Sequence, residues 1–272
     1  MPSTYPNPSI PADLLAMYRM HQNRLPPLST LCADAMRGAL RAIGVEPPSA
    51  PPPARTAAAT AARSAARSEA AMPIEVGRHR LLCGDITQGA AARMLRGDAA
   101  DVVYSDPPWG PGNQRYWHTM NARGSVPRTS WPSFLAAFCG VCAAHRRPDA
   151  PVFVEMGLRW VDELDAAMRS VGLEPRRRWR ILYGPKRKPL PNVLSLFGPR
   201  DVEVTMPDPP HGEPVTRAAL AAVVRPGSIV LDPCTGLGMT ARLTHALGGA
   251  FRGTELNAAR LARTVAWLEK RP

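Results

Sequence analysis

The chain has 272 residues, with 34 Lys or Arg against 22 Asp or Glu, so its formal net charge is +12. Apolar residues make up 45% of it, enough for one large α/β domain with an appendage. No run approaches eighteen uninterrupted apolar residues, which argues against a membrane-spanning helix. The N-terminus lacks the layout of a secretory signal and the cysteine count is odd, so we expect a cytoplasmic protein without a disulfide framework. The basic surplus predicts a polyanionic partner, with nucleic acid as the first candidate.

Composition divides the chain into three parts. Residues 46–72 are rich in Pro and Ala and carry almost no large apolar side chains. Such a segment buries too little surface to offset its ordering entropy, so we expect a linker. Residues 1–45 are expected to form a small helical segment, and residues 73–272 the main domain.

Strands and helices alternate along the main domain. Strands are expected at 79–83, 100–105, 151–155, 179–183, 201–205, 228–232 and 250–255. Helices are expected at 88–95, 131–145, 215–224 and 239–247, with a last helix ending at Trp267 and a long loop before residue 131. This alternation is typical of a Rossmann-like, doubly wound α/β fold, and we expect a mostly parallel sheet of seven strands.

A glycine-containing segment follows one of the expected apolar strands. Asp232 stands at the carboxyl end of that strand, and Pro233 leads into Gly236 and Gly238, which open the next helix. Glycines are needed where the backbone turns tightly and lets a ligand approach. Glu255 ends the following strand, where its carboxylate can accept hydrogen bonds from two ribose hydroxyls. Taken alone, the segment would fit an ordinary strand-turn-helix equally well.

A second motif, Asp106-Pro107-Pro108-Trp109, lies at the carboxyl end of the strand expected at 100–105. Open α/β sheets place their ligand crevices at this end of the strands. The two prolines stiffen the backbone, and Pro107 leaves its carbonyl oxygen as an acceptor. A carboxylate, a carbonyl and a flat aromatic ring suit an aromatic amine, because two acceptors meet its NH₂ group and the indole meets its ring.

In this order, the two motifs resemble those of the permuted beta-class S-adenosylmethionine-dependent DNA amino-methyltransferases, which modify adenine N6 or cytosine N4. In that family the catalytic tetrad precedes the glycine segment, as it does here. Two more segments are similar to the family's: the strand leading into Gly84-Asp85, and His211-Gly-Glu-Pro214. The resemblance covers about residues 78–270 and implies a circularly permuted methyltransferase fold. Many relatives have Lys where this chain has Glu213, and Phe where it has Cys234.

The resemblance also implies a cofactor, S-adenosylmethionine, and a set of site residues. The implied catalytic residues are Asp106, Pro107, Pro108 and Trp109, and the cofactor-binding residues are Asp85, Asp106, Pro214, Asp232, Pro233, Gly236, Gly238 and Glu255. An Asp at the first position of the tetrad favours adenine N6 over cytosine N4. The target base would leave its stack, set its amine against Asp106 and Pro107, and attack the sulfonium methyl group in line.

Basic stretches without acids predict where nucleic acid would bind. No acid lies between Pro107 and Pro148 or between Pro175 and Arg200, and aromatic residues are interleaved with the cations. The expected contacts are Arg115, Tyr116, Trp117, His118, Arg123, Arg128, Arg176, Arg177, Arg178, Arg180, Lys186, Arg187 and Lys188. The first stretch is expected to be a flexible loop closing over the flipped base. The plainer alternative is a solvated basic surface.

Several alternatives stay open. The space between residues 110 and 200 is modest for a target-recognition insert, so specificity is expected to be loose or to need a homodimer or a partner subunit. The tetrad also resembles that of messenger-RNA adenine methylases, so RNA is the main alternative substrate. A cytosine-N4 enzyme, a protein-glutamine methyltransferase and a catalytically silent nucleic-acid-binding subunit are the others. Cys139, Cys142 and His145 have metal-like spacing, but they share one apolar helix without a second ligand pair, so no metal is expected.

Overall fold

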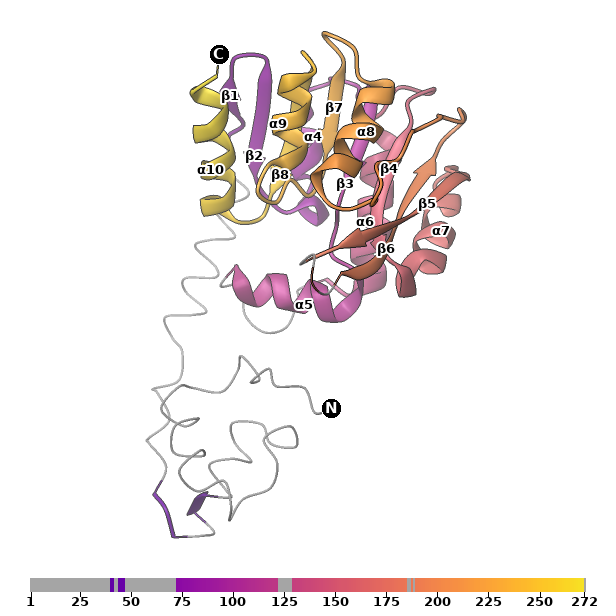
Figure 1. Cartoon of the computed structure of the whole chain (residues 1–272). Helices are drawn as coiled ribbons and strands as arrows, with labels where there is room; N and C mark the ends of the chain where they lie inside the picture. The colour runs from indigo at the N-terminus through magenta and orange to yellow at the C-terminus, as the bar shows by residue number, and fades with distance from the viewer. Residues whose placement is uncertain are drawn as a thin grey trace. The chain divides into compact units, whose positions relative to one another are not determined.

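One sheet of eight strands organises the main domain, in the order β1-β2-β8-β7-β3-β4-β6-β5 (Figure 1). The computed structural model describes residues 40–41, 44–46, 72–121, 129–184, 187 and 189–271. The strands are β1 (Ile74–Val76), β2 (His79–Cys83), β3 (Val102–Ser105), β4 (Val152–Gly157), β5 (Pro175–Tyr183), β6 (Leu190–Phe197), β7 (Ile229–Asp232) and β8 (Ala250–Glu255). Strands β2, β8, β7, β3 and β4 are parallel, whereas β1, β6 and β5 join in antiparallel pairs.

Helices cover both faces of this sheet, which confirms the doubly wound α/β fold (Figure 1). The helices are α4 (Ala90–Leu95), α5 (Gly110–Met120), α6 (Trp131–Ala144), α7 (Val161–Ser170), α8 (Glu213–Val223), α9 (Met239–Ala246) and α10 (Ala258–Glu269), with short 3₁₀ turns η3 (Ile86–Gln88) and η4 (Leu158–Trp160). Met94, Phe138 and Leu164 bring α4, α6 and α7 into one buried cluster with the sheet. Helices α8, α9 and α10 cover the opposite face, where Leu220 and Leu243 are buried against the strands.

The parallel strands all end at one edge of the sheet, here called the carboxyl edge. Because β2, β8, β7, β3 and β4 are neighbours, the residues that follow them converge there although they are far apart in sequence. Helix α5 lies beyond this edge and covers neither face (Figure 1). The carboxyl edge therefore receives both sequence motifs, as the order of strands and motifs predicted.

The expected strand at residues 201–205 is wrong, and the strand count is eight, not seven. Residues 201–205 have no strand pairing, although Val204 is buried and Val202 packs beside it against the second cluster. Their alternating pattern therefore reflects burial of two valines, not a hydrogen-bonded ladder. Strand β6, which pairs with β4, was not predicted. Proline at its start obscured the strand pattern, although its residues are buried from Val193 onward.

The long loop expected after Trp109 is also wrong, because most of it is helix α5. Its sequence, GPGNQRYWHTM, is poor in helix formers, so local propensity gives no signal. Tertiary contacts hold it instead: a Cβ added at Gly110 (φ 82°) would lie 2.2 Å from the Trp160 ring, and Gln114 donates to the Thr129 carbonyl at 2.9 Å. Helix α7 was likewise not anticipated.

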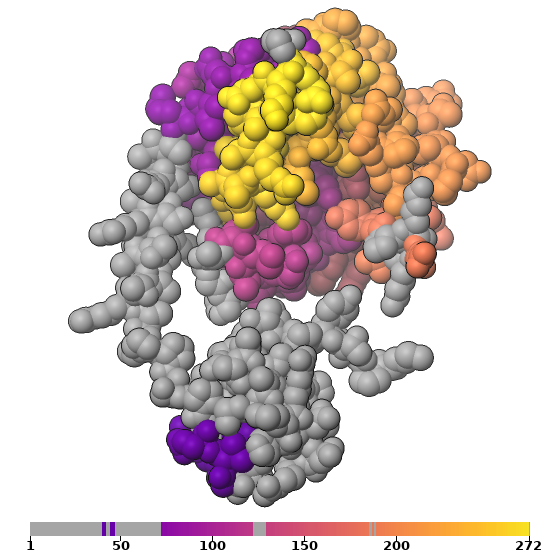
Figure 2. Space-filling model, turned by 60° about the vertical axis from the view of Figure 1, so that its left-hand side comes forward, coloured from indigo at the N-terminus to yellow at the C-terminus, as the bar shows by residue number. Residues whose placement is uncertain are grey.

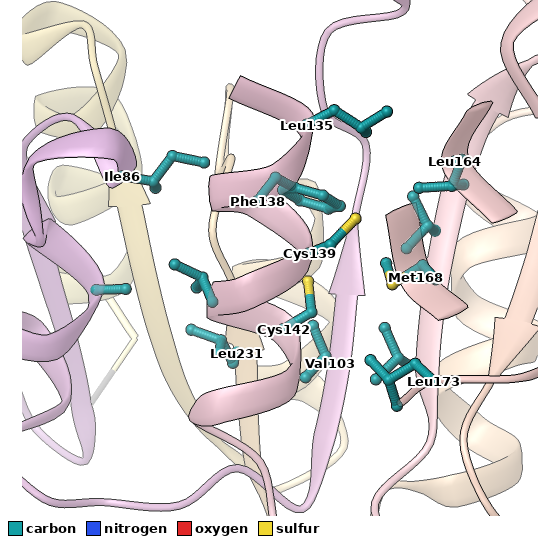
Figure 3. Close-up of a cluster of buried hydrophobic side chains, with 14 of the residues drawn as sticks. Ile86, Val103, Leu135, Phe138, Cys139, Cys142, Leu164, Met168, Leu173 and Leu231 are labelled. Carbon is teal, nitrogen blue, oxygen red and sulfur yellow. The ribbon is translucent and has the colours of Figure 1, made fainter. Parts of the chain in front are cut away.

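Cys139 and Cys142 belong to the apolar core (Figure 3). Both are fully buried on α6 between Phe138 and the side chains of α7. Burial raises the pKa of the Cys139 thiol to about 12 and that of Cys142 well above its usual range, so both stay protonated. A protonated, buried thiol behaves as a small apolar side chain.

The expected helical segment at 1–45 and the linker at 46–72 fall outside the described residues, apart from the helical Leu40-Arg41 and residues 44–46 and 72. The chain divides into two compact units, Met1–Ala59 and Thr60–Pro272, and every strand above belongs to the second. Within the described part, no helix is long and apolar enough to cross a bilayer.

Candidate active site at the carboxyl edge

The glycine segment after β7 forms a tight loop held by Asp232. The Asp232 Oδ1 atom accepts hydrogen bonds from the Ser105 hydroxyl at 2.7 Å and from the Cys234 backbone N–H at 3.0 Å. Gly236 and Gly238 have φ angles of 58° and 77°, a region that glycine adopts without strain. A Cβ at Gly238 would lie 2.4 Å from the Thr264 hydroxyl, so α10 packs too closely for any side chain there.

Glu255 joins this loop to the end of β8. Its Oε2 accepts from the Gly236 N–H and its Oε1 from the Asn257 N–H, both at 2.7 Å. The Gly84 N–H donates to the Glu255 carbonyl at 3.0 Å, and this contact places Asp85 next to Glu255. Asp85 caps η3 by accepting from the backbone and hydroxyl of Thr87. Three segments that are far apart in sequence thus meet at Glu255, two of them through its backbone or carboxylate oxygens.

The Asp-Pro-Pro-Trp motif follows β3 on the same edge. The Trp109 indole N–H donates to the Asp106 Oδ1 at 2.8 Å, and the Trp109 backbone N–H donates to Asn113 Oδ1 at 3.0 Å. The Trp109 ring also meets the Tyr183 ring edge-on, with centroids 4.6 Å apart. A Cβ at Gly157 would approach Trp109 to 3.3 Å, so this glycine makes room for the indole.

Four acidic side chains gather at this edge: Asp106, Glu155, Asp232 and Glu255. Burial raises the pKa of all four, to about 6 for Asp232 and well above the usual range for Asp106, where the neighbouring Glu155 adds to the effect. Among the described residues, none of the four has an ion pair with Arg, Lys or His, although ten such pairs occur elsewhere. The Arg260 charge lowers the pKa of Glu255 only in part, and buried acids without an ion pair favour a positively charged ligand.

The His211–Pro214 segment is fixed to the same edge through β5. His211 pairs with Leu182, and its Nε2 lies 2.7 Å from the Gly184 carbonyl oxygen. Pro214 stands exposed in the first turn of α8. Glu213, in the place where many relatives of the resembled family have Lys, forms an i,i+4 ion pair with Arg217 on its own helix.

Helix α5 carries four of the residues expected to contact nucleic acid. Arg115 and Tyr116 are exposed, His118 is buried, and the Arg260 guanidinium lies 4.0 Å from the centre of the Trp117 ring. An Asn257 to Asn121 hydrogen bond joins the same two helices. Figure 2 shows the magenta surface of α5 directly beneath the yellow α10.

The arginines of β5 are mostly engaged within the chain. Arg177 forms two hydrogen bonds with Asp201, Arg178 pairs with the buried Asp165 of α7, and Arg176 donates to the Gly198 carbonyl. The acids that neutralise them lie outside the acid-free stretch. Arg180 and Arg187 are exposed, and no ion pair to another described residue is found for either. Arg123, Arg128, Lys186 and Lys188 lie outside the described residues.

Sequence reasoning missed Glu155, Tyr183, Asn113 and Arg260. One feature of the sequence could have identified Glu155: it is the lone acid in the apolar strand VFVEMG. Tyr183 ends the strand expected at 179–183, as it ends β5, but its packing on Trp109 was not anticipated. The roles of Asn113 and Arg260 depend on where α5 lies, which local sequence does not encode.

Comparisons with known proteins find similarity in fold. Neither a protein-family model nor a curated protein sequence matches the chain. The solved structure of M1.HpyAVI has a TM-score of 0.50 and 13% identity, covering 69% of this chain and 97% of its own. TTHA0409 from Thermus thermophilus, provisionally described as a DNA modification methylase, has a TM-score of 0.50 at 14% identity, covering 71% and 94%. PvuII DNA methyltransferase, which is cytosine-N4-specific, reaches 0.52 at 12%, covering 71% and 92%. The main domain therefore has a methyltransferase fold.

Replacing Asp232 by Asn tests the burial of its charge. Because its pKa is about 6 when folded and about 4 when unfolded, the folded state binds more protons in that window. The free energy of unfolding therefore falls as pH rises from 4 to 6, by up to about 3 kcal/mol from this group. Asp232→Asn keeps the acceptor for Ser105 and removes this contribution, so its stability profile is flatter.

Urea unfolding of both proteins between pH 4.5 and 7 measures the difference. Removing the Asp232 charge also lowers the pKa of Asp106 toward its usual value, which flattens the profile in the same direction. Parallel profiles for wild type and Asp232→Asn would contradict the assigned burial.

Proposed function

We propose that the chain is an S-adenosylmethionine-dependent DNA methyltransferase that modifies the exocyclic N6 of adenine. The observation that carries the proposal is the juxtaposition of Asp106, in its Asp-Pro-Pro-Trp motif, with buried acids that have no ion pair among the described residues. The buried acids suit a cationic methyl donor, and the Asp106 carboxylate suits an amine that receives the methyl group. The methyltransferase fold supports it.

The residues at the edge fit this cofactor. Glu255, held by two backbone N–H groups, keeps lone pairs for ribose hydroxyls, and Asp85 lies beside it for the adenine. Gly236 and Gly238 give the backbone close access, and Asp232 and Pro233 shape the loop between them and β7. Pro214, exposed in the first turn of α8, is proposed to contact the cofactor as well. When bound, S-adenosylmethionine supplies a methyl group on a positively charged sulfur.

Three residues of the tetrad would handle the target base. The Asp106 carboxylate and the Pro107 carbonyl accept hydrogen bonds from the adenine amine, which localises the nitrogen lone pair for in-line attack. Trp109 and Tyr183 offer ring surface for a base flipped out of its stack. Pro108 keeps the backbone rigid. The nitrogen turns acidic only once alkylated, so Asp106 need not be a strong base beforehand.

The choice of base and nucleic acid belongs to the proposal. The fold does not choose the base, because the cytosine-N4-specific PvuII enzyme shares it. Adenine is proposed from the Asp at position 106, and DNA from the complete glycine segment. Exposed Arg115 and Tyr116 on α5, next to the tetrad, fit a contact with the backbone and bases around the flipped nucleotide.

Modification-sensitive sequencing of DNA from cells that express the chain tests this function. Wild type is expected to yield N6-methyladenine in a defined sequence context, and Asp106→Ala to yield none, because the amine loses its carboxylate acceptor. N4-methylcytosine in place of N6-methyladenine would correct the base. Unmodified DNA from a chain that still binds S-adenosylmethionine would contradict DNA as the substrate and favour RNA.

Salt dependence of DNA binding separates the exposed Arg115 from the paired Arg177. Arg115→Ala is expected to lower the slope of log affinity against log salt by about 1, because one phosphate contact is lost. Arg177→Ala is the matched control: Arg177 is held by Asp201 and should leave the slope unchanged. Fluorescence anisotropy with a labelled duplex measures both. Equal slopes for Arg115→Ala and wild type would contradict a phosphate contact at α5.

A further inference from the structure

Strand β4 places Glu155 next to Asp106. The parallel register pairs Tyr104 with Phe153 and Ser105 with Val154, so the next position sets Asp106 opposite Glu155. Residues directly opposite in a parallel pair point to the same face, and neighbouring strands lie about 4.8 Å apart. The two carboxyl groups are therefore immediate neighbours on the face covered by α8 and α9. Nothing in the family resemblance assigns a role to Glu155.

Buried hydroxyl groups hold Glu155 in place. The Tyr104 hydroxyl donates to Glu155 Oε1 at 2.6 Å, and the Thr216 hydroxyl of α8 donates to the same oxygen at 3.4 Å. Tyr104 and Thr216 are themselves buried, and Glu155 is 5% exposed. Both donors are uncharged hydroxyl groups, so neither offsets the negative charge of the Glu155 carboxylate. A hydrogen-bonded, rigid carboxylate is a fixed negative charge beside Asp106.

The groups around the pair do not compensate its charge. Asp232 faces it from β7 and Tyr183 from β5, both neutral or negative, while Asn192 of β6 lies on the same face one strand away. Trp109 donates one hydrogen bond to Asp106. Burial of both carboxyl groups, together with their mutual repulsion, raises the pKa of Asp106 well above its usual range. Two adjacent buried carboxyl groups resist losing both protons.

We propose that Asp106 and Glu155 form a carboxyl pair in which Glu155, as a negatively charged positioning residue, raises the proton affinity of Asp106. This inference rests on the proposed function and assigns Asp106 a second task in it. After the methyl group has reached the amine, the nitrogen is cationic. Its N–H bond breaks, the bonding electrons stay on nitrogen, and the proton forms an O–H bond with Asp106. Nitrogen and carboxyl group both become neutral, so no water is needed as a base.

Glu155→Gln tests the pair through the pH dependence of methyl transfer. Gln keeps an oxygen acceptor for Tyr104 and Thr216 and removes the charge. The rising, acidic limb of kcat/KM is expected to move to lower pH by about one unit or more, because Asp106 ionises more easily without a negative neighbour. Glu163→Gln is the matched control, since Glu163 is an exposed residue of α7 that accepts from the Trp131 indole, and its loss should leave the profile in place.

The outcomes separate this inference from the proposed function. If wild type transfers methyl groups and Glu155→Gln keeps the same pH profile at a lower rate, Glu155 is structural and the pair is overturned. If wild type transfers none, the proposed function fails, and NMR titration of ¹³C-labelled carboxyl groups then tests the pair in both proteins without turnover. An Asp106 signal that titrates at lower pH in Glu155→Gln supports the pair, and an unmoved signal overturns it.

Discussion

Buried acids without an ion pair among the described residues are the constraint on which the rest of the site depends. An isolated buried carboxylate costs several kcal/mol, and proteins normally offset that cost with an ion pair or several donors. Here the offset comes from neutral donors: backbone N–H groups for Glu255, hydroxyls for Glu155, an indole for Asp106. The pKa values of Asp106, Glu155 and Glu255 are raised because these donors offset the cost of burying the charge only in part. A cationic ligand would offset the remaining cost of burying these carboxylates.

The fold makes this arrangement by bringing strand ends together. Asp106 and Asp232 are more than a hundred residues apart, yet Ser105 of β3 donates directly to Asp232 of β7. The glycines of the loop then let α10 approach so closely that Thr264 fills the space of an absent side chain. Rigid strands and tight turns hold the carboxyl groups in position before any ligand arrives, which is the preorganisation that electrostatic catalysis requires.

The described arginines have different kinds of partner. Several away from the carboxyl edge pair with acids, as Arg178 does with Asp165 and Arg252 with Asp98. Near the edge, Arg260 and Arg159 instead lie over the Trp117 and Trp160 rings, which fix the guanidinium without neutralising it. Among the described residues, Arg115 of α5 is also exposed near this edge. This division suits a cationic cofactor inside and a polyanion outside.

Most of the strands and most of the site could be predicted from sequence, because a motif at the end of a strand indicates both the strand and the edge of the sheet at which its residues lie. Apolar runs ending in Asp106, Asp232 and Glu255 predicted strands and also placed those acids at one edge. Helix α5 and the engagement of Arg178 could not be predicted, since both depend on contacts with distant segments. The same holds for Glu155, whose meaning comes from its register against β3 and not from its neighbours in the chain.

A co-crystal structure of the whole chain with S-adenosylmethionine tests the central claim most directly. We expect the ribose hydroxyls on Glu255, the glycine loop against the cofactor, and the sulfonium methyl group facing Asp106 and the Pro107 carbonyl. A cofactor bound elsewhere, or one at this edge with its methyl group turned away from Asp106, would contradict this expectation.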